Sequence, residues 1–423
     1  MGALAGCPSQ PEEEPPDPTP EPTPSARSAE EFEDVRGGFG PSIDVVEAGA
    51  DPSGDEPIDD VLADVADDGR RLFFPEGTYL LDGFAGQFED LTLLGDGASI
   101  VPRDRETVET LLEVRGPDNA VIGLTFDYRD VEIPPVIRIA GPDGWRFVDC
   151  TFLGMQDTGL DEGGKFCFYP EVTDVDGYGL VRRIGMQDGA APPGEPDTRG
   201  GIWFGPNNEG TIHIDRIWME GWAENTIYCH NSAGPVVIEN SFFRNTNVAG
   251  TRVGGRTILR NNTYVKDDDV PRQGWRPEGQ GQLMRGIWIS GGDSEYGSRG
   301  SVLIEDCDFV FVDEQHGGQA IASAYELDGE ITIRNCRIRQ DFGNAIRVRE
   351  GTPVILDDVS ITGDTDDEAI WIDDEASIEN ANGVVATRGA VSNRESVISA
   401  FETDADPVLP SADPPGGFTN PGG

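Results

Sequence analysis

Eight short segments along the chain share one pattern, in which a variable residue stands between two mostly apolar ones, as in Ile287-Trp288-Ile289. In a β-strand, alternation with a period of two turns the apolar residues inward and the middle residue outward. The outward residues are, in chain order, Arg138, Trp203, Tyr228, Arg252, Trp288, Ala322, Arg347 and Trp371. Aromatic rings stack on sugar rings, and arginine forks hold carboxylate or sulfate groups. This pattern predicts a column that binds an acidic polysaccharide, and the alternative is that the tryptophans only cover packed loops.

Six residues of this column are the predicted substrate-binding residues: Arg138, Trp203, Tyr228, Trp288, Arg347 and Trp371. Cleavage of a glycan would need acid and base groups beside them. Hydrolysis uses two carboxylates about 5–9.5 Å apart. β-Elimination on a uronate uses a base and a group that neutralises the carboxylate, often calcium. The predicted catalytic residues are Glu224, His230, Arg252, Glu314 and His316, with Asp313 and Asp341 as further carboxylates beside the column.

Calcium is the candidate cofactor, and the run Asp267-Asp268-Asp269 is its candidate site. Oxygen ligands suit calcium, but an acidic run is more often a solvated loop. The cysteines and histidines show no spacing of the kind that binds zinc. The metal ligands are therefore left open.

Two classes of function fit the column. One is a lyase or glycoside hydrolase acting on an acidic extracellular glycan, and the other is a non-catalytic glycan-binding, adhesion or structural surface module. Convergence of Glu224, His230 and Arg252 would favour the enzyme. Burial of Trp203 and Trp288 under loops would favour a surface that does not bind glycans at all.

A second repeat indicates how the column is built. It centres on a turn residue between two apolar pairs, as in Val237-Ile238-Glu239-Asn240-Ser241-Phe242. The turn residues are Arg216, Asn240, Asn261, Asp306, Asn335 and Asp358, separated by 24, 21, 45, 29 and 23 residues. Asn and Asp tolerate left-handed backbone and can hydrogen-bond from one copy to the next. Repeats of this period predict a solenoid with one strand set per coil.

Long excursions interrupt the repeat on one side. Insertions are expected at about 153–200 and 265–284, and a shorter loop at 313–318 occupies the same turn. Insertions gathered on one face of a solenoid usually mark its binding face.

The start of the folded part has a recognisable order of elements. Ile43–Gly54 is followed by a helix expected over Pro57–Asp68 and then by Arg71-Leu72-Phe73-Phe74-Pro75-Glu76-Gly77-Thr78-Tyr79-Leu80-Leu81. This passage resembles the N-terminal cap of the pectate-lyase-like superfamily, and with the acidic composition the chain is similar to β-helix repeat proteins of haloarchaeal type. The resemblance implies an all-β, single-stranded right-handed parallel β-helix over 37–400 with a short capping helix. It implies little about activity, because folds of this kind host many functions.

Three cysteines fall at one position of the repeat, namely Cys150, Cys307 and Cys336. The position is expected to point inward, and stacked neighbours would have parallel Cβ vectors that suit a disulfide badly. Buried thiols that pack as small apolar groups are therefore expected.

The charge of the chain is extreme. The 79 Asp and Glu residues against 31 Lys and Arg give a net charge of −48. Such a charge strains a compact fold by self-repulsion unless salt screens it. The composition predicts a halophilic protein and argues against nucleic acid or an anionic membrane surface as partner, since both are polyanions.

The two ends of the sequence predict an attachment and a free tail. Leu4-Ala5-Gly6-Cys7 reads as a lipobox, so residues 1–7 are the remnant of a signal and Cys7 is the predicted lipidation site. The Pro- and Glu-rich residues 8–36 are expected to form a disordered tether, and residues 401–423 a disordered tail. These features predict an extracellular protein that contacts the membrane only through a lipid anchor at Cys7.

Overall fold

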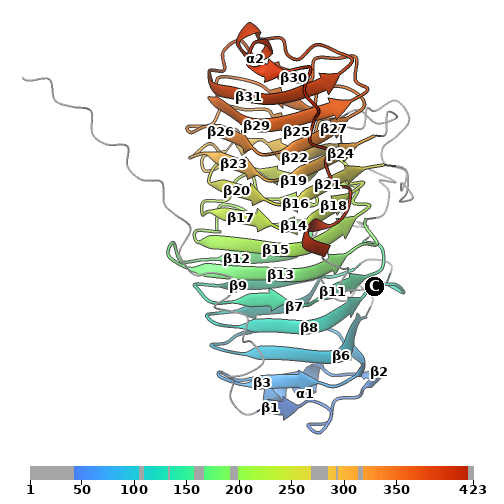
Figure 1. The fold of residues 1–423 in the computed structure, drawn as a ribbon. Helices are drawn as coiled ribbons and strands as arrows, with labels where there is room; N and C mark the ends of the chain where they lie inside the picture. Colours follow the sequence, from blue (N-terminus) through green and yellow to red (C-terminus); the bar gives the residue numbers. More distant parts are fainter. Residues whose placement is uncertain are drawn as a thin grey trace, which may run out of the picture.

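The computed structural model describes residues 42–103, 109–131, 134–156, 166–190, 199–267, 284–291, 294–312 and 318–417. Within these residues the strands form one 21-stranded and one 11-stranded sheet, in which neighbouring strands pair in parallel. Successive coils stack along a single axis, so the chain climbs from β1 at one end to α2 at the other (Figure 1). The fold is a right-handed parallel β-helix, as predicted.

The smaller sheet takes one strand from each coil. Its strands are β5 (Phe84–Gln87), β7 (Thr110–Arg115), β9 (Val136–Gly141), β12 (Phe166–Val172), β14 (Gly200–Trp203), β16 (Ile227–Tyr228), β19 (Ala249–Val253), β22 (Arg285–Ile289), β25 (Ile321–Ser323), β28 (Ile346–Val348) and β30 (Ile370–Ile372).

The larger sheet takes the remaining strands, in two lanes joined at a bend. They are β1 (Ser42–Asp44), β2 (Ser53–Pro57), β3 (Arg71–Phe74), β4 (Gly77–Leu81), β6 (Thr92–Pro102), β8 (Ala120–Asp127), β10 (Arg146–Val148), β11 (Thr151–Leu153), β13 (Tyr178–Met186), β15 (Thr211–Glu220), β17 (Val236–Glu239), β18 (Phe242–Arg244), β20 (Thr257–Arg260), β21 (Thr263–Lys266), β23 (Val302–Glu305), β24 (Asp308–Phe311), β26 (Ile331–Arg334), β27 (Arg337–Gln340), β29 (Val354–Gly363), β31 (Ile378–Thr387) and β32 (Phe401–Glu402).

The bend between the two lanes lies where the turn residues were predicted. All six have positive φ, in the range 47–57°. The predicted hydrogen bonding between coils also occurs, since Asn261 Nδ2 donates to Asn240 Oδ1 at 2.7 Å. The left-handed backbone turns the strand sharply while the side-chain amides join the coils. The Asn/Asp repeat therefore specifies both the bend and the stacking.

The interior is a continuous apolar core filled by the inward residues of every coil. The predicted capping helix is present but shorter than expected: α1 spans Asp59–Val65. Its Leu62 and the preceding Ile58 are buried in the core. The helix therefore covers the open end of the first coil. At the other end, α2 (Glu395–Ile398) inserts Val397 into the same core.

The expected insertion at 153–200 is wrong for its central part. Residues 166–186 contain β12 and β13, which pair with the coils on both sides and form a complete coil of their own. The apolar pattern there is aromatic and glycine-rich (Phe166-Cys167-Phe168), so the aliphatic repeat does not reveal it. Of the second insertion, expected at about 265–284, residues 268–283 lie outside the described residues, and Val265 and Lys266 belong to β21.

The expected disorder of residues 401–423 is also wrong for residues 401–417. Strand β32 pairs with β31, and Pro415–Gly417 forms a 3-10 turn. Between them the chain runs back along the outside of the larger sheet (Figure 1), where Thr263 Oγ1 donates to the backbone oxygen of Asp413 at 3.2 Å. The expectations for residues 1–7 and 8–36, including Cys7, lie outside the described residues.

None of the described helices is long and apolar enough to span a membrane.

The five described cysteines are free and buried: Cys150, Cys167, Cys229, Cys307 and Cys336. Burial raises the pKa of Cys150 and of Cys167 to about 12. Because only the thiolate is a good nucleophile, we expect a Cys7→Ser variant to show no fast reaction with a disulfide reagent such as DTNB until it is unfolded. Rapid labelling of the folded variant would contradict the thiol placement.

Candidate functional site

The predicted outward residues form a continuous column on the outer face of the smaller sheet. From Trp203 to Trp371 each is paired in register with the next: Trp203 with Tyr228, then Arg252, Trp288, Ala322, Arg347 and Trp371. Their strand neighbours on either side, such as Ile287 and Ile289, are fully buried. The alternation therefore faces the column outward, as expected.

The sequence-based column misses one member. Arg138 pairs with Tyr169 of β12, and Tyr169 comes from the coil that was expected to be an insertion. Its ring lies 5.7 Å from the ring of Trp203 at an interplanar angle of 61°. The column between Arg138 and Arg252 is thus an uninterrupted aromatic run of Tyr169, Trp203 and Tyr228.

The arginines of the column stack on its aromatic rings. The guanidinium carbon of Arg252 lies 4.7 Å from the centre of the Tyr228 ring and 4.1 Å from that of Trp288, so it sits between the two. Arg138 lies 4.4 Å from Tyr169, and Arg347 lies 5.1 Å from Trp371. Cation–π contacts of this kind contribute about 0.5–2 kcal/mol each. A stacked guanidinium keeps its hydrogen-bonding edge in the plane, where carboxylate or sulfate oxygens can meet it.

The tryptophans differ in what they offer to a ligand. Trp288 has two guanidinium groups over its ring, since Arg285 lies 4.3 Å from the ring centre in addition to Arg252. No described arginine lies over Trp203. Both tryptophans are half-buried rather than enclosed. Trp203 is therefore better placed to stack on a sugar ring, and Trp288 to orient arginines.

The catalytic candidates converge only in part. The ring of His230 lies 4.7 Å from that of Tyr228 at 89°, and Arg252 contacts the same tyrosine, so these three groups meet. His230 is only 6% exposed. Glu224 precedes this group in the chain, is half-buried and accepts a hydrogen bond from the Asn225 side chain.

The remaining candidates do not join that group. Asp341 accepts from Arg339 Nη2 at 3.0 Å and from the backbone N–H of Asp364 at 3.1 Å. Asp313, Glu314 and His316 lie outside the described residues, as do Asp268 and Asp269. Asp267 pairs with Arg244 at 2.8 Å. The described part of the chain holds no cluster of three His, Cys, Asp or Glu side chains arranged for a metal ion.

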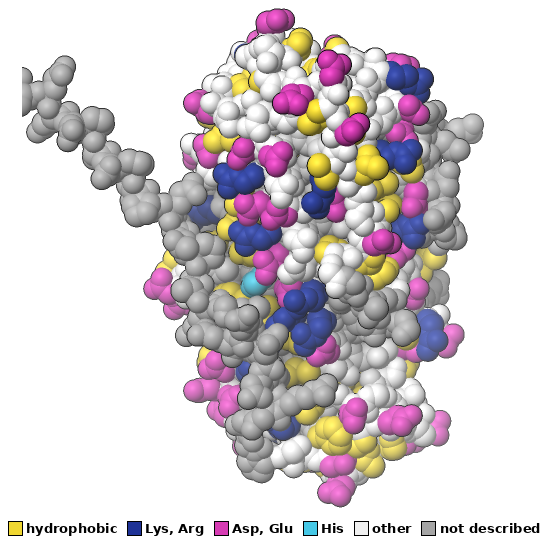
Figure 2. Space-filling model, viewed as in Figure 1, with side chains coloured by type: hydrophobic (Ala, Val, Ile, Leu, Met, Phe, Trp, Pro, Cys, Tyr) yellow, Lys and Arg dark blue, Asp and Glu magenta, His cyan; other side chains and the backbone are white. Residues whose placement is uncertain are grey.

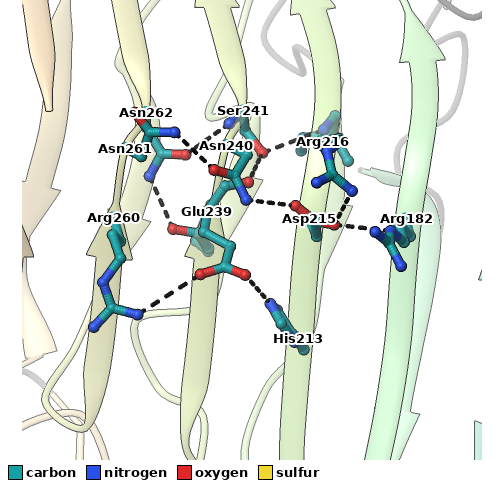
Figure 3. Close-up of polar contacts among 12 residues, drawn as sticks. Arg182, His213, Asp215, Arg216, Glu239, Asn240, Ser241, Arg260, Asn261 and Asn262 are labelled. Carbon is teal, nitrogen blue, oxygen red and sulfur yellow. Dashed lines mark hydrogen bonds and ion pairs between the residues drawn. The ribbon is translucent and has the colours of Figure 1, made fainter. Parts of the chain in front are cut away.

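A polar network on the outer face of the larger sheet was not predicted (Figure 3). His213 Nδ1 lies 2.6 Å from the Tyr178 hydroxyl, and His213 Nε2 lies 2.9 Å from Glu239 Oε1. Next to it, buried Arg182 and Asp215 pair at 2.9 Å. The alternation Ile212-His213-Ile214-Asp215 is a signal for outward polar residues here, but it does not reveal their partners on other coils.

From Asp215 this network continues as a ladder of charges across the coils. Asp215, Glu239, Arg260, Glu305, Arg334 and Asp357 are paired in register. Arg260 reaches Glu305 at 3.0 Å, and Arg334 reaches Asp357 at 3.1 Å. Most of these side chains are partly exposed, so each pair contributes about 0–1 kcal/mol. The ladder joins neighbouring coils through several weak ion pairs.

Glu239 gives this ladder a pH dependence. The hydrogen bond from His213 holds the pKa of Glu239 below its usual value, against the opposing effect of burial. A carboxyl group with a lower pKa in the folded state stabilises the fold above its unfolded pKa of about 4.3, and this stabilisation is lost as the pH falls through the folded pKa. We expect Glu239→Gln to lower the free energy of unfolding by about 1–2 kcal/mol near neutral pH. The decrease in the free energy of unfolding between neutral and acid pH is expected to be smaller in this variant than in the natural protein.

Denaturant unfolding near neutral pH and at acid pH checks this expectation. Glu295→Gln is the matched control, because Glu295 is 73% exposed and pairs only loosely with Arg299 at 3.3 Å. Equal changes in the free energy of unfolding for the two variants, at both pH values, would contradict the role of Glu239.

The chain has no match among protein-family models or curated sequences, but its structure is similar to solved structures. No protein-family model matches the chain, and no curated protein matches its sequence. The structure is similar to the catalytic unit of a GH87 alpha-1,3-glucanase from Streptomyces thermodiastaticus, with a TM-score of 0.50 and 15% identity, covering 86% of this chain and 68% of that one. It is less similar to the surface protein and adhesin PfbA of Streptococcus pneumoniae (TM-score 0.42, 12% identity, 86% and 99% covered) and to the Dettilon tailspike protein (0.38, 12%, 85% and 70%). At 15% identity, the likeness to the glucanase catalytic unit shows the fold alone.

Proposed function

We propose that the protein binds an acidic polysaccharide outside the cell, along the column of the smaller sheet. The observation that carries this proposal is the stacking of Arg252 between Tyr228 and Trp288, with Arg138 and Arg347 stacked in the same manner. Neighbouring coils are about 4.8 Å apart, so an extended chain lying along the axis meets a new side chain at each coil. The aromatic run takes sugar rings, and the arginines take their acidic groups.

The aromatic run of Tyr169, Trp203 and Tyr228 is bracketed by Arg138 and Arg252. These two arginines lie four coils apart, a distance of about 19 Å. A solvated column in a chain with 79 acidic and 31 basic residues would ordinarily be acidic. Placing scarce arginines beside aromatic rings on one column supports a polyanionic glycan as the ligand.

Cleavage of the glycan is the second candidate function, and the contact of His230 and Arg252 with Tyr228 favours it. In a β-elimination, Arg252 would neutralise the uronate carboxylate, and Tyr228 or His230 would take the proton from the adjacent carbon. A double bond then forms to the next carbon as the bond to the leaving sugar oxygen breaks, and that oxygen takes up a proton from solvent or from the protonated base, which leaves an unsaturated end. Hydrolysis would instead use Glu224 with a second carboxylate, for which Glu314 is the sequence candidate. The glucanase named above supports this second candidate by its fold alone.

A panel of uronate, sulfated and neutral glycans, incubated with the protein in concentrated salt, tests both functions. Products are analysed by mass spectrometry, and retention on each immobilised glycan is measured in parallel. Retention on acidic glycans that stay intact establishes the binding function. Unsaturated fragments establish a lyase, and fragments that have gained water establish a hydrolase. If the protein is not retained on any acidic glycan and cleaves none of them, the proposal is overturned.

The proposal places the protein at the cell surface, held by a lipid on Cys7 and by the acidic tether of residues 8–36. A single acyl chain anchors only weakly, so stable attachment needs more than one. The intact mass of the native protein from its source tests the anchor, and an unmodified Cys7 overturns it.

A further inference from the structure

Three arginines of the described chain lack the polar partners that the others have. The guanidinium groups of Arg138, Arg347 and Arg349 make neither an ion pair nor a hydrogen bond within the described residues. On the face shown in Figure 2, by contrast, most basic side chains lie next to acidic ones. In a chain with a net charge of −48, guanidinium groups without a carboxylate indicate a partner that is not part of the fold.

Arg347 and Arg349 form a pair near one end of the column. Arg347 is the outward residue of β28, Val348 is buried, and alternation turns the exposed Arg349 to the same side, about 7 Å away along the strand. Burial and the charge of Arg349 lower the pKa of Arg347, so the two groups are close enough to repel each other. On the coil of Arg252 the position of Arg349 is held by Gly254. That coil therefore presents one arginine where this one presents two.

The surroundings leave this pair without a counter-ion. The guanidinium carbon of Arg347 lies 5.1 Å from the ring centre of Trp371, and its Nε is buried without a hydrogen-bond partner. Asp373 follows on the next coil, where its Oδ1 accepts from the backbone N–H of Glu375 at 3.1 Å. No ion pair within the described residues joins Asp373 to Arg349. An acidic group supplied by a ligand would satisfy both arginines and relieve their repulsion.

The pair is separated from the rest of the column. Trp288, Ala322 and Arg347 are paired in register on successive coils, and Ala322 is only 4% exposed. The coil of Ala322 therefore offers a ligand neither a ring nor a charge. Arg347 lies three coils beyond Arg252, about 14 Å, and seven coils beyond Arg138, about 34 Å. A ligand that fills the aromatic run must extend well past it to reach the pair.

We propose that Arg347 and Arg349 form a second acid-group subsite of the column, which takes a carboxylate or sulfate carried by a sugar about 14 Å from the one at Arg252. This inference rests on the proposed glycan binding and narrows its ligand to a long polyanion whose acidic groups recur along the chain. A short acidic oligosaccharide fills the stretch from Arg138 to Trp288 and leaves the pair empty. Carboxylate and sulfate share the chemistry, since both present two oxygens to a guanidinium fork.

The test compares acidic oligosaccharides of two lengths. Oligogalacturonates carry carboxylates and κ-carrageenan fragments carry sulfates, and both are used as tetrasaccharides and dodecasaccharides. Their affinities are measured by calorimetry at one fixed salt concentration, because salt screens charge. For Arg347→Gln/Arg349→Gln we expect the dodecasaccharide affinity to fall by at least about tenfold, because two charged forks are lost, and the tetrasaccharide affinity to stay unchanged. The series that shows this loss identifies the acidic group.

Arg339→Gln/Arg388→Gln is the matched control. It removes the same charge from two exposed arginines, which pair with Asp341 and Asp364 away from the column. It is expected to leave both affinities unchanged. The unchanged tetrasaccharide affinity of the Arg347→Gln/Arg349→Gln variant also shows that this variant is folded.

Equal losses for tetrasaccharides and dodecasaccharides would overturn the inference, because the pair would then serve the main binding stretch. Full dodecasaccharide affinity of the Arg347→Gln/Arg349→Gln variant, or the same loss in the control, would overturn it as well, while binding by the natural protein would still support the proposed function. If the natural protein binds neither series at either length, the proposed function is overturned and this inference with it.

Discussion

Transfer of the protein from about 3 M to about 0.1 M KCl is expected to lower the free energy of unfolding by several kcal/mol and the Tm by tens of degrees. The 79 acidic residues exceed the 31 basic ones, so 48 carboxylates have no basic residue to match them. At about 0.1 M salt their repulsion reaches about 10 Å, and at about 1 M it reaches only about 3 Å. Because unfolding moves the charges apart, weaker screening favours the unfolded state.

The ion pairs of the fold act in the opposite direction, because salt weakens them. Arg299 and Glu295, with side chains 44% and 73% exposed, are a typical exposed pair. Such pairs contribute about 0–1 kcal/mol each. Buried pairs such as Arg182 with Asp215, 6% and 2% exposed, are screened much less. The unmatched carboxylates outnumber the pairs, so the net effect of salt is to stabilise.

Thermal unfolding followed by circular dichroism over a series of KCl concentrations measures this effect. A parallel series in sucrose separates charge screening from general exclusion of a cosolute, because sucrose carries no charge. A Tm that stays constant or falls with rising KCl would contradict the expectation, and with it the halophilic character inferred from the composition.

The coil repeat of this protein is predictable from the sequence because both of its signals are local. Alternation in Ile287-Trp288-Ile289 sets the outward residue, and the Asn or Asp of the turn sets the bend. The coil of Tyr169 escaped prediction since Phe166-Cys167-Phe168 lacks the aliphatic pattern and long excursions flank it. This one atypical coil was therefore missed, although the architecture was predicted correctly.

The contacts within the site were less predictable, because they join residues from different coils. Alternation places Tyr228, Arg252 and Trp288 on one face, but only their side-chain conformations decide that the arginine lies between the rings. His213 likewise meets Tyr178 and Glu239 from the neighbouring coils on either side. A single sequence gives the order of residues in a column, and packing in three dimensions decides which of them touch.

Arg252→Met is expected to reduce affinity for an acidic glycan by about 10- to 100-fold, which corresponds to about 1.4–2.7 kcal/mol. Two aromatic rings hold the guanidinium at 4.7 and 4.1 Å, and its Nε donates to Ser290 Oγ at 2.7 Å. The fork is therefore oriented before a ligand arrives, so little conformational entropy is lost on binding. Methionine keeps much of the apolar stem but supplies neither the charge nor the fork.

Arg252→Lys separates charge from geometry. Lysine keeps the positive charge but lacks the planar fork that stacks on the rings and meets two oxygens at once. We expect its affinity to fall between that of the natural protein and that of Arg252→Met. The control is Arg339→Met on the larger sheet, where Arg339 is 50% exposed and paired with Asp341. Retention on immobilised acidic and neutral glycans measures the effect.

Loss of binding to acidic glycans alone would assign Arg252 to recognition of their charge. Equal losses on acidic and neutral glycans would show that Arg252 acts by holding the Tyr228 and Trp288 rings in place. Full affinity of Arg252→Met would contradict the column as the binding site, because no other arginine of the described chain stacks between two aromatic rings.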